Sequence, residues 1–265
     1  MPGPPKLLLV GGGRMGEALL GGLLDAGWAD AEELAVAEPL EQRRDEMAQR
    51  FPGVLLAADP VRASGAVLAV KPHDVEAACG SLAPLGISRV LSIAAGVTLR
   101  SLEGWLDPGT AVVRAMPNTP ALVGAGAAAI AAGTAASEDD MAWAEEILGA
   151  VGTVVRVKEP LLDAVTGLSG SGPAYVFLVA EALIDAGVLV GLTHEVATTL
   201  ATQTILGAGR LLVESGETPE SLRGAVTSPG GTTAAGLRAL EEAGVRAAFL
   251  DAVHAATTRA AELGA

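Results

Sequence analysis

Short aliphatic runs alternate with helical stretches from Leu7 to Val157, and this alternation limits the possible folds more than any other feature. It is typical of a parallel sheet whose faces are covered by helices. The expected strands are Leu7–Val10, Leu34–Ala37, Ala66–Val70, Val90–Ile93, Ala111–Met116 and Thr153–Val157. After about Glu159 the chain reads as successive helices. We therefore expect an α/β domain over residues 1–158 and an all-α domain over residues 159–265.

Charge excludes several classes of partner. The 265 residues carry a formal net charge of −14, and no run of Lys or Arg interrupts the acidic balance. Such a field repels polyanions, so we expect neither nucleic acid nor an acidic membrane surface as a partner. The strongest candidate for a membrane span, residues 174–192, contains Glu181 and Asp185, and ionisable residues are costly inside a bilayer.

Cysteine usage and the N-terminus point to the cytoplasm. Cys79 is the only cysteine, so a disulfide within the chain and a metal cluster built on thiolates are excluded. No metal-ligand spacing is found among the histidines and carboxylates, and we expect no metal. The first residues run into Leu7 without the apolar core and cleavage site of a signal peptide.

The helical part is small, yet half of all residues in the chain are apolar. A small domain buries a modest fraction of its surface by itself. We therefore expect these helices to pack against a second subunit, which predicts an oligomer.

A glycine-rich turn follows the first expected strand and opens the next helix. Gly11, Gly13 and Gly16 form the spacing G-x-G-x-x-G, with Arg14 and Met15 between the last two glycines. The first glycine permits a tight turn, the second lets a pyrophosphate approach the backbone, and the third lets helix and strand pack closely. We expect a Rossmann-type dinucleotide site here, and a ligand-free βα turn is the alternative.

The second strand leads to Glu38, about 20 residues beyond the turn, where an acidic side chain accepts hydrogen bonds from an adenosine ribose. Glu38 favours NADH. Arg43 and Arg44 follow and could serve the 2′-phosphate of NADPH, or they could lie on the solvated face of a helix. The choice between NADPH and NADH stays open.

Later strands also end in residues suited to a dinucleotide. The expected cofactor contacts there are Ala69, Val70, Lys71, Pro72, Ala95, Gly96 and Asn118. Small residues leave room for a flat ring, a lysine can face a phosphate or hydroxyl, and an asparagine amide can meet a nicotinamide or ribose. An exposed lysine and a plain turn asparagine are the alternatives.

The segment Ser228-Pro229-Gly230-Gly231-Thr232-Thr233 interrupts the helical part. It delivers hydroxyls and backbone N–H groups to a helix that begins near Thr232, and such a helix end attracts anions. The alternative is a tight turn, in which Gly230 or Gly231 supplies a positive φ and Thr232 or Thr233 caps the helix.

Taken together, these motifs resemble the pyrroline-5-carboxylate reductase family. The resemblance runs almost end to end and rests on residues 11–16, 69–72, 114–120, 163–175, 203–204 and 228–233. It implies a Rossmann-type domain followed by a helical dimerisation domain, and therefore a homodimer or a higher homo-oligomer built on dimers. It also implies reduction of 1-pyrroline-5-carboxylate to L-proline, the last step of proline biosynthesis, with NADPH or NADH as hydride donor. His73 and Glu38 depart from the family pattern, and Glu38 bears on cofactor choice.

The resemblance further implies that the 228–233 loop holds the substrate carboxylate beside a nicotinamide bound to the partner subunit. The loop chemistry agrees, because Ser228 and the backbone N–H groups from Gly231 to Thr233 can bind a carboxylate. The hydroxyl of Thr233 can meet the ring nitrogen, which makes Thr233 the expected catalytic residue. A cyclic imine can take its proton from solvent, so no dedicated acid is needed, and we expect structural roles for His194 and His254.

Two other hypotheses compete with this interpretation. An oxidoreductase similar to the β-hydroxyacid dehydrogenases would need a lysine at the position of Val176, after Gly167, Gly170 and Gly172. A non-catalytic nucleotide-sensing module would be favoured by a degraded 228–233 loop, whereas this loop is intact.

Overall fold

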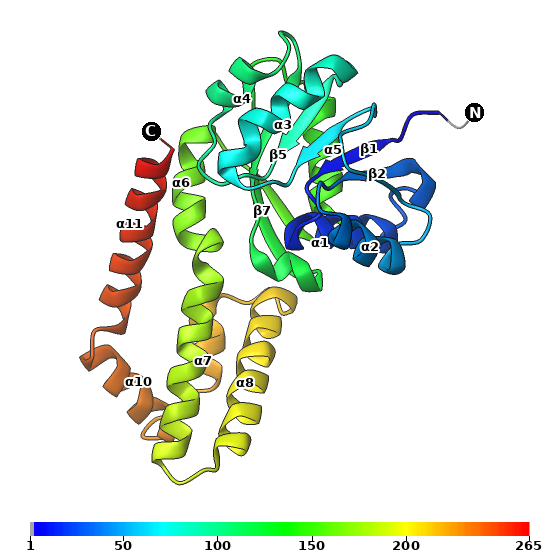
Figure 1. Cartoon of the computed structure of the whole chain (residues 1–265). Coiled ribbons are helices and arrows are strands. Elements are labelled where there is room, and N and C mark those ends of the chain that lie inside the picture. The colour runs from blue at the N-terminus through cyan, green and yellow to red at the C-terminus, as the bar shows by residue number, and fades with distance from the viewer. Residues whose placement is uncertain (1–2, 265) are drawn as a thin grey trace. The chain divides into compact units, whose positions relative to one another are not determined.

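A computed structural model describes residues 3–264, which divide into two compact units (Figure 1). The first unit runs through Ser171 and includes the chain from His254 onward, and the second contains Gly172–Val253. The last helix, α11 (Val245–Leu263), contributes to both. The boundary expected at residues 158 and 159 lies soon after the last strand, β8 (Gly152–Arg156), and before the division between the units.

The first unit is built on one eight-stranded sheet with the order β3-β2-β1-β4-β5-β6-β7-β8. Besides β8, its strands are β1 (Leu7–Val10), β2 (Leu34–Ala37), β3 (Leu55–Ala57), β4 (Ala66–Leu68), β5 (Arg89–Ser92), β6 (Ala111–Met116) and β7 (Gly126–Ala132). Strands β1 to β6 are parallel, β7 is antiparallel to β6, and β8 is parallel to β7. The expected Rossmann-type α/β fold is confirmed, with a mixed sheet in place of a wholly parallel one.

Two strands were missed by the sequence analysis. β3 is only three residues long and pairs with β2 at the edge of the sheet. β7 is rich in alanine, a residue that favours helices and is depleted in strands. It is nevertheless a strand because β6 and β8 pair with it on both sides. The ends of β4, β5 and β8 differ from the expected ends by one or two residues.

Helices cover both faces of this sheet. In β1, Leu7 and Leu9 belong to the core formed with α1 (Arg14–Asp25), α2 (Glu41–Arg50) and α5 (Glu138–Gly149). Leu8 and Val10 belong to the opposite core with α3 (Val75–Leu82) and α4 (Leu99–Trp105). A strand covered on both faces is apolar at every position, which explains the unbroken aliphatic run.

The sheet is followed by a helical path that contains one change of winding. α6 (Leu162–Val165) leads into a single π-helical turn (Thr166–Gly170), and α7 (Gly172–Leu189) follows. The glycine-rich stretch at residues 166–171 is therefore a π turn followed by a bend, and no loop separates α6 from α7. Single π turns inside helices occur frequently at functional sites. Short 3-10 helices lie at Ala31–Glu33, Pro72–Asp74, Ala83–Leu85, Thr119–Val123 and Glu159–Leu161.

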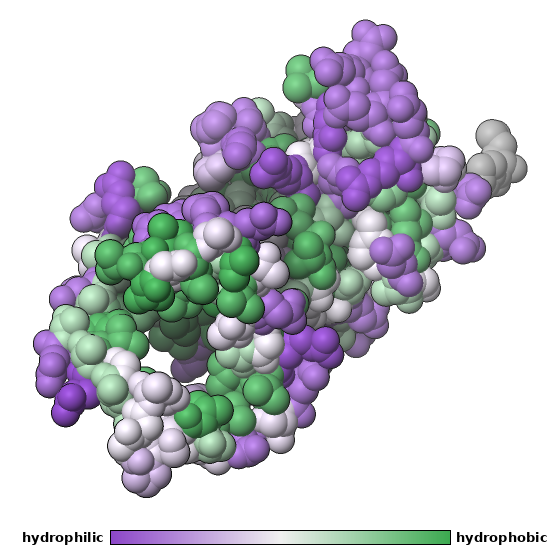
Figure 2. All heavy atoms as spheres, turned by 90° about the horizontal axis from the view of Figure 1, so that it is seen from below, coloured by the Kyte–Doolittle hydropathy of each residue, from purple (hydrophilic) through white to green (hydrophobic). Residues whose placement is uncertain are grey.

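The second unit is helical, as expected. It contains α7, α8 (His194–Glu214), α9 (Pro219–Ala225), α10 (Thr232–Glu242) and the first part of α11. Within residues 172–253 only Ala197 and Ala201 are buried. Figure 2 shows broad apolar patches on the face seen from below. The exposed large apolar side chains of this unit include Phe177, Leu178, Leu189, Leu200, Leu211, Val213 and Leu250.

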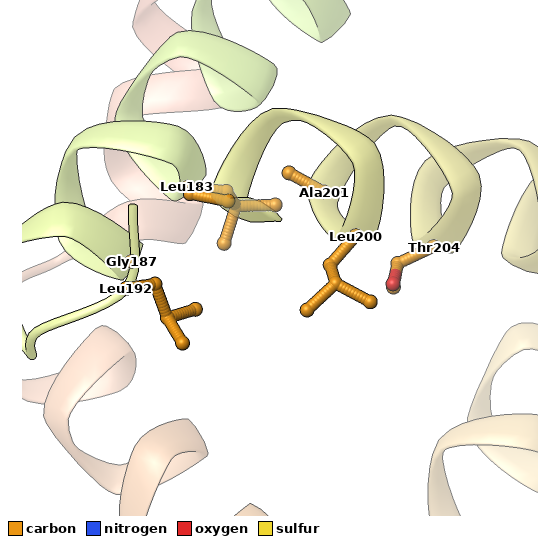
Figure 3. Close-up of a pocket in the computed structure, with 7 residues that line it drawn as sticks. Leu183, Gly187, Leu192, Leu200, Ala201 and Thr204 are labelled. Atoms are coloured by element: carbon orange, nitrogen blue, oxygen red, sulfur yellow. The ribbon is translucent and has the colours of Figure 1, made fainter. Parts of the chain in front are cut away.

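An open apolar hollow of about 170 Å³ lies between α7 and α8 (Figure 3). The two helices approach closely there, since a Cβ on Gly187 would lie 2.9 Å from the Cβ of Ala197. The hollow is lined by Leu183, Gly187, Leu192, Ala197, Leu200, Ala201 and Thr204.

Two helical stretches, Glu159–Leu189 and α8, are long and apolar enough to span a membrane, by length and composition alone.

Candidate active site

The glycine turn after β1 has the geometry that its spacing predicts. Gly11 has a φ of 108°, in the region that favours glycine, and its N–H donates to the carbonyl of Ala37 at 2.8 Å. A Cβ on Gly11 would lie 2.8 Å from the carbonyl oxygen of Ala69, and one on Gly16 would overlap the carbonyl oxygen of Gly11. Both glycines are therefore required by close packing of the turn.

Gly13 differs from these two glycines because it faces open space. Apart from its own neighbours along the chain, no atom of the described residues lies within 4 Å of a Cβ built there. Gly13 is the N-cap of α1, no side chain caps the helix, and the N–H of Glu17 donates to the Gly13 carbonyl at 2.8 Å. Arg14 is exposed and Met15 half-buried in the first turn. An uncapped helix start beside open space fits a pyrophosphate.

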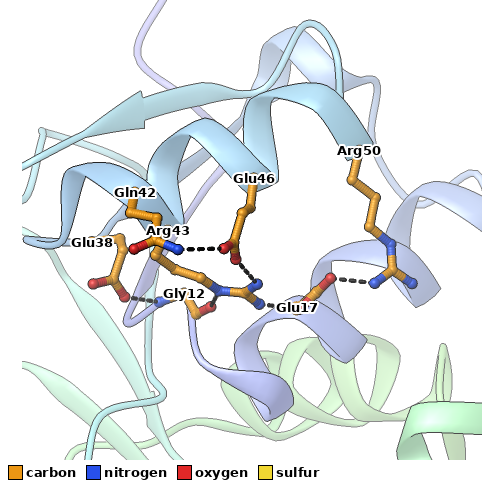
Figure 4. A network of polar contacts seen from close by, with 7 residues as sticks. All are labelled: Gly12, Glu17, Glu38, Gln42, Arg43, Glu46 and Arg50. Atoms are coloured by element: carbon orange, nitrogen blue, oxygen red, sulfur yellow. Dashed lines mark hydrogen bonds and ion pairs between the residues drawn. The ribbon is translucent and has the colours of Figure 1, made fainter.

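Glu38 holds the turn from the end of β2 (Figure 4). The side chain is only 8% exposed, and its Oε2 accepts a hydrogen bond from the N–H of Gly12 at 2.9 Å. Its Oε1 accepts one from the N–H of Leu40 at 3.0 Å. The carboxylate thus lies beside the glycine turn, where an adenosine ribose binds in this fold, and each oxygen keeps a lone pair for a ribose hydroxyl.

The other expected cofactor contacts lie at the same edge of the sheet. Ala69 and Val70 follow β4 and are half-buried, whereas Lys71 and Pro72 are exposed. The Lys71 amine forms no hydrogen bond to any described residue. Ala95 is exposed after β5, and Gly96 has a φ of 76°. Since β1, β2, β4 and β5 are parallel neighbours, their carboxyl ends border one crevice.

Asn118 has a structural role that the sequence analysis missed. Its Nδ2 donates to the carbonyl of Ser169 at 3.0 Å, and its Oδ1 accepts from the N–H of Ala127 at 2.8 Å. The amide therefore links the end of β6 to β7 and to the π turn. A Cβ on Gly170 would lie 2.6 Å from Cε of Met116, so the π turn packs on the end of this strand. One amide hydrogen and one lone pair of Asn118 remain for a ligand.

A buried ion pair supports the same region. Arg114 on β6 is 7% exposed, and its Nη1 donates to Oε1 of Glu159 at 2.9 Å. The same oxygen accepts from the N–H of Leu99 at the start of α4 at 2.6 Å. Glu159 thus joins three elements around the beginning of the helical path. Its spacing from Arg114 in the sequence carries no signal for this contact.

In the second unit, the expected substrate loop ends at an uncapped helix. Gly230 has a φ of 71°, and Gly231 is the N-cap of α10 with no side-chain cap. A Cβ on Gly231 would overlap the Ser228 hydroxyl. The suggestion that Thr232 or Thr233 caps the helix is wrong, because both lie inside its first turn. Among the described residues, no hydrogen bond partner is found for the hydroxyls of Ser228, Thr232 and Thr233.

The remaining titratable groups show no further catalytic arrangement. Burial raises the pKa of the Cys79 thiol to about 11, so this cysteine is not a ready nucleophile. His73 is exposed beside Asp74, and His194 lies at the start of α8 with Nδ1 3.4 Å from the Thr198 hydroxyl. Within residues 3–264, no cluster of three or more His, Cys, Asp or Glu side chains is arranged to hold a metal ion.

The sheet order, the glycine turn and the acid after β2 define a dinucleotide-binding protein of the Rossmann class. Family models agree with both parts of the chain. Residues 6–96 match the family described as NADP oxidoreductase, coenzyme F420-dependent. Residues 159–263 match the family described as pyrroline-5-carboxylate reductase dimerisation.

Full-length relatives narrow this class to one family. The pyrroline-5-carboxylate reductase of Synechocystis is 47% identical, and that of Methanosarcina acetivorans is 44% identical, each over 98% of both chains. The solved structure of the Coxiella burnetii pyrroline-5-carboxylate reductase is 38% identical with a TM-score of 0.93, over 99% of this chain and 100% of that one. This chain belongs to the pyrroline-5-carboxylate reductase family.

A second solved structure bears on the cofactor. The Plasmodium falciparum pyrroline carboxylate reductase, determined with NADP bound, is 31% identical with a TM-score of 0.85 over 98% of both chains. More distant structures share only the fold. A prephenate dehydrogenase from Aquifex aeolicus, for example, is 15% identical with a TM-score of 0.54.

Proposed function

We propose that this protein reduces 1-pyrroline-5-carboxylate to L-proline with NADPH or NADH as hydride donor. The observation that carries the proposal is the uncapped start of α10, which presents unpaired hydroxyls of Ser228 and Thr233 in a chain of this family. A cyclic imino acid offers one carboxylate and one ring nitrogen, and the loop offers a matching anion site and hydroxyl.

Each group of the loop has a distinct task in this proposal. The N–H groups of the first turn of α10 and the Ser228 hydroxyl bind the substrate carboxylate, aided by the helix dipole. The hydroxyl of Thr233 accepts a hydrogen bond from the protonated ring nitrogen, which keeps the imine in its reactive form. A reduced nicotinamide bound to the first unit of the partner subunit supplies the hydride. The open space at Gly13 and the free Lys71 amine suit its phosphates.

The assembly follows from the same findings. A helical unit with only two buried residues leaves its apolar side chains exposed in a single chain. Residues 159–263 match the family's dimerisation domain, so we propose that this surface is covered by a second copy. The dimer would also account for the apolar character of α7 and α8. We propose in addition that the protein works in the cytoplasm, with neither a membrane nor nucleic acid as a partner.

The test is an assay of NADH and NADPH oxidation with 1-pyrroline-5-carboxylate, with L-proline measured as the product. Turnover with at least one cofactor is expected. Folded protein that binds a dinucleotide but produces no proline would contradict the proposal. Oxidation of a β-hydroxyacid by the same sample would favour the competing dehydrogenase. Dinucleotide binding without turnover on either substrate class would favour a sensing module.

A further inference from the structure

Two adjacent arginines at the start of α2 have different surroundings, although the sequence offers both as partners for a 2′-phosphate. Both are half-buried and lie beyond Glu38, at the edge of the sheet where the adenosine ribose of a dinucleotide binds. Their hydrogen bonds show which of the two is free to recognise a ligand.

Arg43 is fully engaged within the protein (Figure 4). Its Nε donates to the carbonyl of Gly12 at 2.8 Å, and its Nη1 donates to Oε2 of Glu46 at 2.9 Å. Its Nη2 forms an ion pair with Glu17 on α1. The hydrogen bonds to Glu46 and Glu17 raise the pKa of Arg43 above its usual value. The two carboxylates offset the positive charge of this guanidinium, so it attracts a phosphate only weakly.

The contacts of Arg43 give it a positioning role. The Gly12 peptide is held on both sides, since Glu38 accepts from its N–H and Arg43 donates to its carbonyl. This peptide directly precedes Gly13, whose open side faces the expected pyrophosphate. Fixing it presents the N–H groups of the turn in one orientation, which lowers the entropy cost of binding. That benefit is the same for NADH and NADPH.

Arg44 keeps donors that the protein does not use. Its Nη1 donates to the carbonyls of Glu38 and Pro39, both at 2.8 Å, which anchors the guanidinium at the end of β2. Its Nε and Nη2 form no hydrogen bond to the described residues, and no carboxylate among them pairs with it. The side chain is thus an anchored cation whose remaining donors are free for a ligand. Planar guanidinium groups with paired free donors match phosphate geometry.

We propose that Arg44 recognises the 2′-phosphate of NADPH, whereas Arg43 positions the glycine turn for either cofactor. The inference rests on the proposed function only in requiring that the first unit binds a nicotinamide dinucleotide. It explains how a chain with an acidic residue beside the ribose accepts a 2′-phosphate: Arg44, held on the backbone of Glu38 itself, offsets the charge of the Glu38 carboxylate.

The experiment measures binding of adenosine fragments to the full-length protein by calorimetry. The probes are 2′,5′-ADP, which carries the 2′-phosphate, and 5′-AMP, which lacks it. Arg44→Ala should weaken 2′,5′-ADP about tenfold or more and leave 5′-AMP unchanged. Arg43→Ala should weaken both probes by the same factor. Arg50→Ala removes an equal charge from the other end of α2. This control variant should leave the ratio of the two affinities unchanged.

Arg43→Lys guards against misfolding of Arg43→Ala, because it keeps the charge near Glu17 and Glu46 while losing the fork of donors. It too should weaken both probes equally. The inference is overturned if Arg44→Ala leaves the ratio of the two affinities unchanged, or if a folded Arg43 variant loses 2′,5′-ADP selectively. Parent protein that binds neither NADPH nor NADH would contradict the proposed function instead, so the two failures are distinguishable.

Discussion

The two compact units bury their apolar residues in different ways. In the first, Leu7, Leu8 and Leu9 are wholly buried between helices on both faces of the sheet. In the second, Leu178 is 65% exposed and Val213 is 84% exposed. The first unit therefore contains its own core, whereas we infer that the second needs a partner surface to remove its apolar side chains from water.

Their candidate sites differ in a related way. Around the dinucleotide turn, Glu38 and Arg43 already hold the Gly12 peptide. In the 228–233 loop, the hydroxyls of Ser228 and Thr233 have no partner among the described residues. We infer that the first site is organised before its ligand arrives, while the second obtains its hydrogen bonds from the ligand.

The largest expected effect concerns the core of the first unit. Leu9→Ala removes a wholly buried side chain, so it should lower the free energy of unfolding by about 2–5 kcal/mol. Denaturant titration would measure it. Leu189→Ala, at a position 86% exposed, is the matched control and should have a far smaller effect on the first unit. Equal losses would contradict the contrast between the units.

The next effect concerns association through the second unit. Leu178→Glu places a charge in the exposed apolar surface and should weaken the dimer by about 2–4 kcal/mol, because an interface core excludes unpaired charge. Sedimentation over a range of protein concentrations would show the change. Val155→Glu makes the same change at an exposed position of β8 in the first unit and should leave assembly intact. A dimer unaffected by Leu178→Glu would place the interface elsewhere.

Substitutions at Thr233 test whether the 228–233 loop binds the substrate. Thr233→Ala and Thr233→Val delete the hydroxyl but keep the backbone N–H, so kcat/KM for the imino acid should fall by about 1.5–3 kcal/mol, or roughly ten- to a hundredfold. Affinity for the dinucleotide should not change. Thr153→Val, at an exposed position of β8, controls for the substitution itself. If both Thr233 variants work at the parent rate, Thr233 has no catalytic role.

A substitution at Gly13 tests whether the glycine turn binds the pyrophosphate of the dinucleotide. Gly13→Ala adds a methyl group to open space in the free protein, so unfolding should change little. The methyl group would meet the pyrophosphate, and dinucleotide affinity should fall by about 1–3 kcal/mol. Gly80→Ala on α3, also in open space, is the control for the affinity measurement. An unchanged affinity for NADH and NADPH would show that the pyrophosphate does not approach Gly13.

The smallest effect is a change in cofactor preference. Glu38→Ser removes a charge beside the ribose and should shift the ratio of kcat/KM values toward NADPH by about 1–2 kcal/mol. Because Glu38 also accepts from the N–H of Gly12, both values should fall in absolute terms. The ratio is therefore the measurement that matters, and a ratio equal to that of the parent would show that Glu38 does not face the ribose.

Sequence alone determined the features that arise from local chemistry. The ends of β1, β2 and β6 and the start of α10 at Thr232 agree with the expectations. Of the two glycines offered for a positive φ in the tight-turn alternative, Gly230 has one. An aliphatic run between turn residues, or a glycine where other residues would be strained, is recognisable from its neighbours in the chain. The family resemblance added the dimer and the substrate, which no local pattern contains.

Only the tertiary structure decided the features that depend on residues far apart in the chain. The alanine-rich segment of β7 is a strand because β6 and β8 pair with it, and the amide of Asn118 is used by Ala127 and Ser169. Arg43 and Arg44 are equivalent in the sequence, yet one faces Glu17 and Gly12 while the other keeps free donors. Such differences depend on which distant groups approach a side chain, and the residues next to it in the chain do not reveal that.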